Sequence, residues 1–245
     1  MCEIISALEI MDYNTLQLVE KHGVDGNDSC SRLLRDMLQL DHHTSTHQQS
    51  ELSSWPLFLL VETQGSNAEH DASKMESFLT RLYDSDDTIH NGFLAQDSKQ
   101  LMEMWNIREL CNPSTARAGC VYKFDVSIPI DEYMDVAREV EMKLNQSDLV
   151  VCTWGHVADG NAHINIVTPG VYEKDPALAK HIETTVFGSV LKRKGSISAE
   201  HGLGQSKNEC LNQIKEESVL DMMRQVKRLF DPHGIMNPGK YLPND

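Results

Sequence analysis

Apolar and polar residues alternate, or recur with a helical period, along most of the chain. Short or alternating apolar runs predict strands at residues 57–63, 121–129, 149–154 and 163–167, the first of them a buried strand. A helical period of apolar residues predicts helices at 13–22, 69–83, 97–110, 131–145, 175–192 and 217–230. The chain is therefore expected to combine a sheet with packed helices.

Two further segments and one connection complete the expected architecture. Residues 3–11 mix apolar and small side chains and fit either a strand or a buried helix, whereas the polar, turn-rich stretch 24–54 predicts an irregular segment. Residues 149–154 turn straight back into 163–167, which requires an antiparallel pair. We predict an α+β fold, with a mainly antiparallel sheet and helices packed on one face.

Composition and charge narrow the classes of function. The chain has 245 residues, of which 40% are hydrophobic, as in an ordinary globular protein. Its formal net charge of −15 repels phosphate backbones and argues against nucleic-acid binding. The most apolar run, residues 55–61, is too short to span a bilayer, and the first residues show no secretory or transit pattern.

Two histidines flank a predicted tight turn. Asp159-Gly160 is a strong signal for a two-residue hairpin, which would place His156 directly opposite His163. Opposed residues have Cβ atoms about 4.5–5.5 Å apart, so two imidazoles there could hold one metal ion. The strand period also puts Trp154 and Asn165 on that face. A longer loop would alter the pairing but would leave both histidines beside the turn.

A third metal ligand is predicted in the glycine-flanked segment 195–204. Catalytic metal ions usually have three protein ligands, and Glu200 is the best candidate for the third. His201, next to it, suits acid–base work because histidine titrates near neutral pH. Taken alone, these residues fit surface or core roles about as well as they fit a metal site.

Three long motifs resemble those of the flavin-dependent D-2-hydroxy-acid dehydrogenases. They are GHVADGNAHIN at 155–165, GSISAEHGLG at 195–204 and FDPHGIMNPGKYLP at 230–243, in the same order as in that family. VETQGSNAEHD at 61–71 resembles the branch of the family that acts on D-2-hydroxyglutarate. The resemblance implies a ferredoxin-like cap fold and a C-terminal substrate- and metal-binding domain over residues 1–245.

The resemblance also implies roles for single residues. His156, His163 and Glu200 match ligands of zinc or a similar divalent metal, and His201 matches the residue that takes the substrate hydroxyl proton. The remaining matches are residues that hold the substrate (Arg108, Asn112, Lys123 and Asn165) and residues near the flavin (Asn237 and Lys240). By spacing alone, a plain salt bridge explains Arg108 and Lys123 as well.

The chain departs from the family pattern in three ways. Ala158 replaces a glycine, and Asn112 replaces a threonine that contacts the substrate in the closest relatives. No segment resembles the family's N-terminal flavin-binding domain, since no glycine-rich diphosphate loop precedes residue 195. The expected activity, FAD-dependent oxidation of a 2-hydroxy dicarboxylate, would thus need FAD bound mostly by another domain.

Other readings of the resemblance stay open. The substrate could be D-lactate or glycolate, or the chain could be a truncated, non-catalytic fragment that binds hydroxy acids. The family further implies an electron-transfer flavoprotein or another acceptor as partner, and a mitochondrial location. Two cationic side chains, Arg108 and Lys123, favour a dicarboxylate because each carboxylate needs its own partner.

Overall fold

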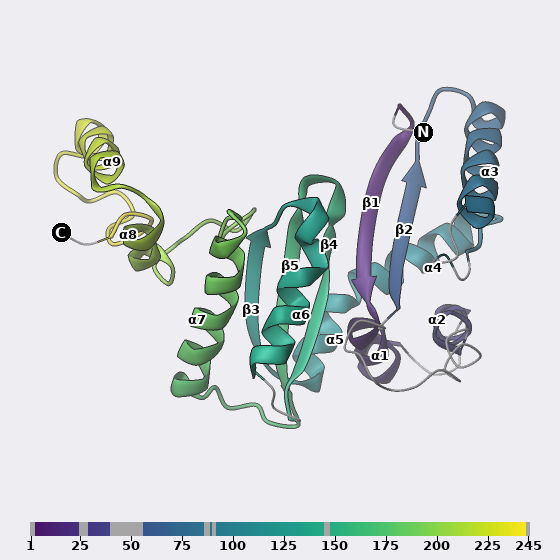
Figure 1. Ribbon diagram of the computed structural model, residues 1–245, viewed down its shortest axis with the longest axis horizontal. Coiled ribbons are helices and arrows are strands. Elements are labelled where there is room, and N and C mark those ends of the chain that lie inside the picture. The colour runs from purple at the N-terminus through teal and green to yellow at the C-terminus, as the bar shows by residue number, and fades with distance from the viewer. Residues whose placement is uncertain are drawn as a thin grey trace.

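Five antiparallel strands form one sheet in the order β2-β1-β4-β5-β3 (Figure 1). The computed structural model describes residues 3–24, 29–39, 56–85, 89, 92–144 and 148–243. The strands are β1 (Ile5–Asp12), β2 (Leu57–Thr63), β3 (Gly119–Ser127), β4 (Val150–His156) and β5 (Asn161–Pro169). The helices are α1 (Tyr13–His22), α2 (Ser29–Gln39), α3 (Ala68–Ser85), α4 (Ser98–Glu109), α5 (Cys111–Ala118), α6 (Tyr133–Leu144), α7 (Pro176–Lys192), α8 (Leu211–Ile214) and α9 (Glu217–Phe230).

Most predicted elements are confirmed, and local chemistry explains where several of them begin. Residues 3–11 resolve to a strand, β1, which lies between β2 and β4. Helix α1 begins after Asp12, whose carboxylate accepts the Thr15 backbone N–H, and it ends at Gly23. Helix α7 begins in the same way: Asp175 caps it, and Pro176 occupies its first position.

Two predictions about single elements are wrong. The stretch 24–54 contains helix α2, which buries Cys30, Leu34 and Leu38 at a spacing of four residues; residues 25–28 and 40–54 lie outside the described part of the chain. This helical spacing of apolar residues is short and lies among polar residues, so it did not stand out in the sequence. Strand β2 is not buried as predicted, because it forms an edge of the sheet and its Leu57 and Leu59 are 42% and 53% exposed.

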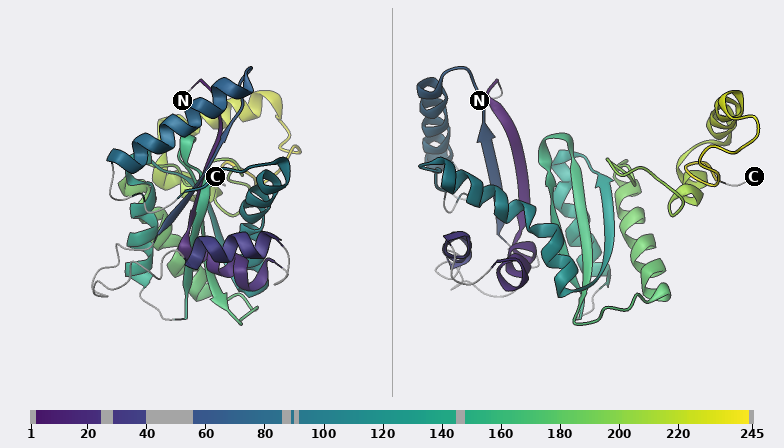
Figure 2. Two further views of the ribbon diagram at one scale, coloured as in Figure 1. Left: turned by 90° about the vertical axis from the view of Figure 1, so that its right-hand side faces the viewer. Right: turned by 180° about the vertical axis from the view of Figure 1, so that it is seen from behind.

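The α+β class is confirmed, but helices cover both faces of the sheet and not one. Helices α6 and α7 pack on one face, and α1, α2, α4 and α5 contribute to a second apolar cluster on the other. Figure 1 shows α6 in front of β4, and Figure 2 shows α4 and α5 on the opposite side. The second layer is required because that face also carries apolar residues, among them Met11 and Trp154.

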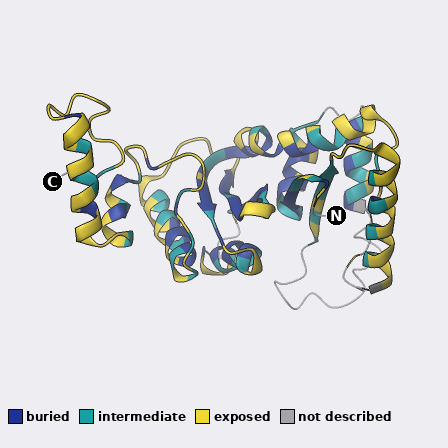
Figure 3. Cartoon of the chain, turned by 90° about the horizontal axis from the view of Figure 1, so that it is seen from above, coloured by how far each residue is buried: buried dark blue, intermediate teal, exposed yellow. Residues whose placement is uncertain are grey.

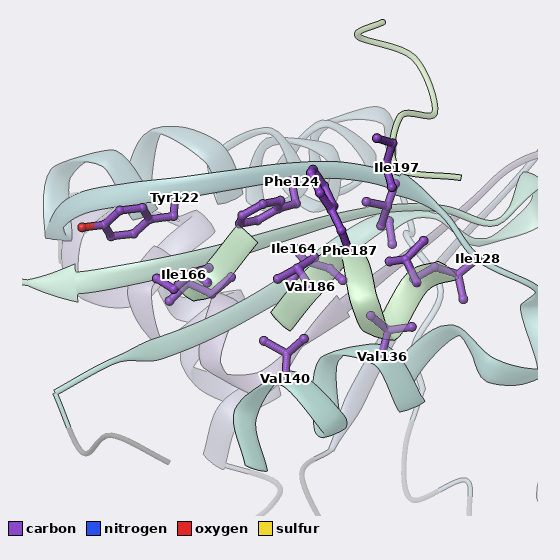
Figure 4. Packing of buried hydrophobic residues seen from close by; sticks show 14 of the residues in the cluster. Tyr122, Phe124, Ile128, Val136, Val140, Ile164, Ile166, Val186, Phe187 and Ile197 are labelled. Carbon is purple, nitrogen blue, oxygen red and sulfur yellow. The ribbon is translucent and has the colours of Figure 1, made fainter. Parts of the chain in front are cut away.

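The larger core lies between the sheet and helices α6 and α7. Alternate residues of β3 and β5, including Phe124 and Ile164, meet Val140 and Phe187 from the two helices (Figure 4). The rings of Phe124 and Phe187 meet edge to face, with centroids 5.5 Å apart. Each fully buried side chain of this size contributes roughly 1.5–3 kcal/mol. The sheet is therefore a rigid base for residues on its other face.

The C-terminal segment after α7 lies at the opposite end of the molecule from β1 (Figure 1). Helix α9 buries Leu220 in the larger core but is mostly exposed elsewhere (Figure 3). Met222, Val226 and Leu229, which recur at helical spacing, are more than half exposed. Within the described residues, no helix is both long and apolar enough to cross a membrane.

Candidate metal centre

The candidate residues gather on the face of the sheet that α1, α2, α4 and α5 cover. His163 in β5 lies between Asp125 in β3 and Trp154 in β4, and the next pair on this face is Lys123 with Asn165. His156, two residues beyond Trp154, pairs with Glu9 in β1. Because side chains of a strand alternate between faces, all of these residues point to the same side.

The turn between the two histidines differs from the predicted one. Residues Val157–Asp159 form a short 3₁₀ turn, and Gly160 follows in the left-handed conformation at φ +76°. His163 therefore lies opposite Trp154, and the predicted direct pairing with His156 is wrong. The register differs by two residues, so both histidines stay on the predicted face. Their ring centroids are 6.3 Å apart.

Two overlapping sets of side chains could hold a metal ion. In the described residues, His156, His163 and Glu200 have ligand atoms within 4.8 Å of one another, and so do Asp125, His163 and His201. His156 Nε2 lies 3.6 Å from Glu200 Oε1. An ion about 2.0–2.2 Å from each of two such atoms fits that separation. Two nitrogens and one carboxylate oxygen, partly exposed, are typical of a catalytic site with an open position.

Asp125 anchors the loop that carries Glu200. Its Oδ2 accepts the backbone N–H groups of Ala199, Glu200 and His201 at 3.2, 2.9 and 2.9 Å. Burial alone would raise the pKa of Asp125, but the N–H groups of His201 and Glu200 outweigh it and hold the pKa below its usual value. Asp125 thus serves to hold the loop, and we take the set with His156, His163 and Glu200 as the candidate metal ligands, because its two imidazoles and one carboxylate are a usual catalytic ligand set.

The same loop is fixed at the edge of β3. Ser196 exchanges two backbone hydrogen bonds with Ser127, at 2.8 and 2.9 Å. Gly195 permits this approach, because a Cβ there would lie 2.4 Å from the Ser127 carbonyl oxygen. The glycines of the motif thus serve backbone contact, and the loop delivers Glu200 and His201 beside the histidine pair.

Each ring of the histidine pair has a carboxylate near its Nδ1 atom. Glu9 Oε1 accepts a hydrogen bond from His156 Nδ1, and Asp125 Oδ1 lies 4.0 Å from His163 Nδ1. Burial lowers the pKa of His163 despite that neighbour. A neutral imidazole is the form that binds metal. The sequence prediction missed Glu9 and Asp125; an acid between two apolar residues of a strand is the signal that could have found them.

Arg108 reaches the site from helix α4. Its Nε donates to Glu9 Oε2 at 2.7 Å, and the side chain is 10% exposed. Within the described part of the chain, its two terminal nitrogens have no hydrogen-bond partner. The alternative of a plain salt bridge therefore describes one edge of the guanidinium, and its other donors can still receive a carboxylate.

The other predicted substrate residues meet helix α5. Lys123 Nζ donates to Asn112 Oδ1 at 2.8 Å, and Asn165 Nδ2 donates to Thr115 Oγ1 at 3.4 Å. His201 is exposed and stacks on His163, with ring centroids 5.8 Å apart. The structure thus brings these residues beside the histidine cluster, where a small acid could touch several of them.

The two predicted flavin contacts lie elsewhere. Asn237 and Lys240 belong to the exposed turn that follows α9, where Asn237 adopts φ +49°. Asn208 Nδ2 holds this turn through the Gly239 carbonyl oxygen at 3.3 Å. The structure does not bring Asn237 or Lys240 together with the histidine cluster, so their role stays a prediction.

Comparisons with known proteins agree along nearly the whole chain. The family described as FAD linked oxidases, C-terminal domain, matches residues 2–241. The mitochondrial D-2-hydroxyglutarate dehydrogenase of Bos taurus is 34% identical over 98% of this chain and 39% of its own length. A mitochondrial Schizosaccharomyces pombe protein described as a D-lactate dehydrogenase is 36% identical over 98% of this chain and 43% of its own length. The chain thus spans about two fifths of the length of these relatives.

A solved structure supports the fold. Alkyldihydroxyacetonephosphate synthase superimposes with a TM-score of 0.53 over 96% of this chain and 39% of that protein, at 12% sequence identity. At this identity, the likeness concerns the arrangement of strands and helices alone.

Proposed function

This chain belongs to the FAD-linked oxidase family, as a C-terminal domain, and from that premise we propose that it binds the substrate and a divalent metal ion in a D-2-hydroxyglutarate dehydrogenase. The complete enzyme would oxidise D-2-hydroxyglutarate to 2-oxoglutarate. The observation that carries the proposal is the cluster of His156, His163 and Glu200 beside the partly unpaired guanidinium of Arg108. Relatives named D-2-hydroxyglutarate dehydrogenase, which match nearly the whole chain, support it.

The proposed roles follow from the chemistry of each side chain. Zinc or a similar ion, when bound by His156, His163 and Glu200, supplies Lewis acidity to a coordinated hydroxyl. His201, exposed and beside the cluster, would take the hydroxyl proton as a general base. FAD, bound mostly outside this domain, would supply the two-electron acceptor. Asn237 and Lys240, on their separate turn, are proposed to contact that flavin.

The substrate class follows from the cations at the rim. A hydroxy dicarboxylate has two anionic ends, and Arg108 and Lys123 give each end a partner. Asn112 and Asn165 would supply amide hydrogen bonds to the same acid. D-lactate, which has a single carboxylate, is the competing candidate substrate, because the S. pombe relative is described as a D-lactate dehydrogenase.

The cell compartment and acceptor extend the proposal to the complete enzyme. Relatives with mitochondrial names support that compartment, and an electron-transfer flavoprotein is the proposed acceptor. If imaging finds the tagged complete enzyme outside mitochondria, the proposed compartment is wrong. If the reduced enzyme fails to reduce a purified electron-transfer flavoprotein, the proposed acceptor is wrong.

We expect the purified chain to hold about one divalent ion, as a three-ligand site should. H156A and H163A should each lose the ion. Loss of a residue that only supports a ligand weakens metal affinity by about 10- to 100-fold, and loss of a ligand itself should weaken it further. Mass-spectrometric metal analysis after dialysis measures this. H181A, which changes an exposed histidine on α7, is the control and should keep the ion. Equal metal content in all four proteins would refute the metal site.

The metal-loaded chain should bind D-2-hydroxyglutarate about 10- to 100-fold more tightly than D-lactate in a calorimetric titration. The margin corresponds to one additional hydrogen-bonded ion pair, about 1.5–3 kcal/mol. R108K, which keeps the charge but loses the planar fork, should narrow the preference. K180Q on the outer side of α7 should not change it. Tighter binding of D-lactate would favour the lactate dehydrogenase assignment. The same titration with a metal-stripped sample measures how much of the binding affinity the ion contributes.

A further inference from the structure

Glu9 is a buried carboxylate that none of the proposed roles uses. It lies in β1 between Leu8 and Ile10, and it is 3% exposed. The register of the sheet makes it the direct cross-strand partner of His156. A carboxylate buried to this degree is costly unless both of its oxygens have donors.

Both oxygens of Glu9 are occupied, and by different parts of the site. Oε1 accepts from His156 Nδ1, and Oε2 accepts from Arg108 Nε at 2.7 Å. With its proton on Nδ1, the His156 ring presents a bare Nε2, and Nε2 is the atom that lies 3.6 Å from Glu200 Oε1. The bond to Arg108 fixes the edge of the guanidinium and leaves its outer nitrogens for a ligand.

We propose that Glu9 is a positioning residue that sets the metal-binding tautomer of His156 and, through the same carboxylate, the orientation of Arg108. This inference rests on the proposed function and adds to it a physical link between the metal ligands and the substrate cation. A carboxylate behind a ligating histidine fixes the ring and raises its basicity. Here one carboxylate binds both His156 and Arg108, so a change at either residue should affect the other.

Glu9→Gln tests this because an amide has only one acceptor oxygen. It cannot accept from both His156 Nδ1 and Arg108 Nε. The amide oxygen should keep the charge-assisted bond to Arg108. Its NH₂ group then faces His156, which must move its proton to Nε2 and thereby block the metal-binding nitrogen.

The measurement is the tautomer of His156 in metal-free protein labelled with ¹⁵N-histidine. Long-range ¹H–¹⁵N spectra distinguish the two tautomers at a pH where the ring is neutral, and H156Q assigns the signal. The wild type should show the proton on Nδ1, and E9Q should show it on Nε2. In a competition titration with a chromogenic chelator, E9Q should bind Zn²⁺ about 10- to 100-fold more weakly.

E62Q is the matched control. Glu62 on the adjacent strand β2 also accepts a hydrogen bond from α4, at Trp105 Nε1, but touches neither His156 nor Arg108. E62Q should therefore match the wild type in tautomer and in Zn²⁺ affinity. A general loosening of α4 against the sheet would instead affect both variants alike, and that result would overturn the positioning role.

Two outcomes separate this inference from the proposed function. If the wild type binds no metal but shows His156 with its proton on Nδ1 and E9Q reverses it, the metal proposal fails and the positioning role stands. If the wild type already carries the proton on Nε2, the inference is wrong whether or not E9Q folds. Wild-type tautomer and Zn²⁺ affinity in a folded E9Q would overturn it as well.

Discussion

Replacing Asp125 with alanine should weaken divalent metal binding by about 10- to 100-fold and lower the free energy of unfolding by about 2–4 kcal/mol. The reason is the loop after α7, whose three consecutive N–H groups converge on one Asp125 oxygen. Without the carboxylate these donors lose a charge-assisted partner, and Glu200 is no longer held beside His156. Denaturant unfolding and a chelator competition titration measure the two effects.

The design of this test separates the loop from general surface charge. D125N keeps one acceptor oxygen but loses the charge, so it should fall between wild type and D125A in both measurements. D135A removes an exposed carboxylate that, among the described residues, pairs with Arg138 on the surface of α6, and it should cost less than about 1 kcal/mol. Wild-type metal affinity in D125A would show that the loop is positioned by other contacts.

A second large effect is expected at Gly155, directly before His156. Its φ of +154° is rare for residues with side chains, and a Cβ there would lie 2.3 Å from the Asn161 carbonyl oxygen and 2.7 Å from Tyr133 Oη. Those two atoms are themselves joined by a hydrogen bond of 2.6 Å. G155A should therefore destabilise the protein by about 2–5 kcal/mol, since the backbone and the tyrosine must both move.

Gly188 offers a control of opposite sign. It lies in the interior of α7, is exposed, and has no atom within 4 Å of the position that a Cβ would occupy. G188A should stabilise the protein by about 0.5–1 kcal/mol, because alanine favours helix and restricts the unfolded chain. Thermal unfolding of both variants checks the pair. A G155A protein as stable as the wild type would show that β4 can shift at little cost.

The period of two along β4 and β5 was sufficient to place the site on one face. Trp154, His156, His163 and Asn165 share that face as predicted, because it depends only on alternation. The exact register was not predictable from Asp159-Gly160. The chain makes a 3₁₀ turn before Gly160 in place of the two-residue hairpin turn. The Gly160 carbonyl oxygen accepts a hydrogen bond from the backbone N–H of Ile128, which is distant in the sequence, and this contact favours the observed turn.

Two helices of the second layer, α2 and α5, were not predicted because the sequence marks them weakly. Helix α5 has 8 residues and contains Pro113, and α2 is surrounded by polar sequence. Helices α1 and α4 of the same layer were predicted, but the sequence pattern does not show which face of the sheet each helix covers. The same omission removed Thr115, which receives the Asn165 amide, from the candidate site.

Glu9 and Asp125 could not be assigned from spacing, since their partners are far away in the chain. Glu9 meets His156 across 147 positions and Arg108 across 99. Such contacts follow from the strand order β2-β1-β4-β5-β3, which local patterns do not determine. Sequence resemblance supplied the candidate metal ligands, whereas only the structure supplied the carboxylates that lie beside them.

Those two carboxylates bear on the order in which ligands are expected to bind at the candidate site. With Glu200 they outnumber the cationic side chains of Arg108 and Lys123, in a chain whose formal net charge is already −15. A dianionic acid approaching the metal-free site would therefore meet repulsion, which a bound divalent cation would reverse. We therefore expect the metal ion to bind before the hydroxy acid. The ion would act as the charge switch that admits the substrate, before any of its chemistry begins.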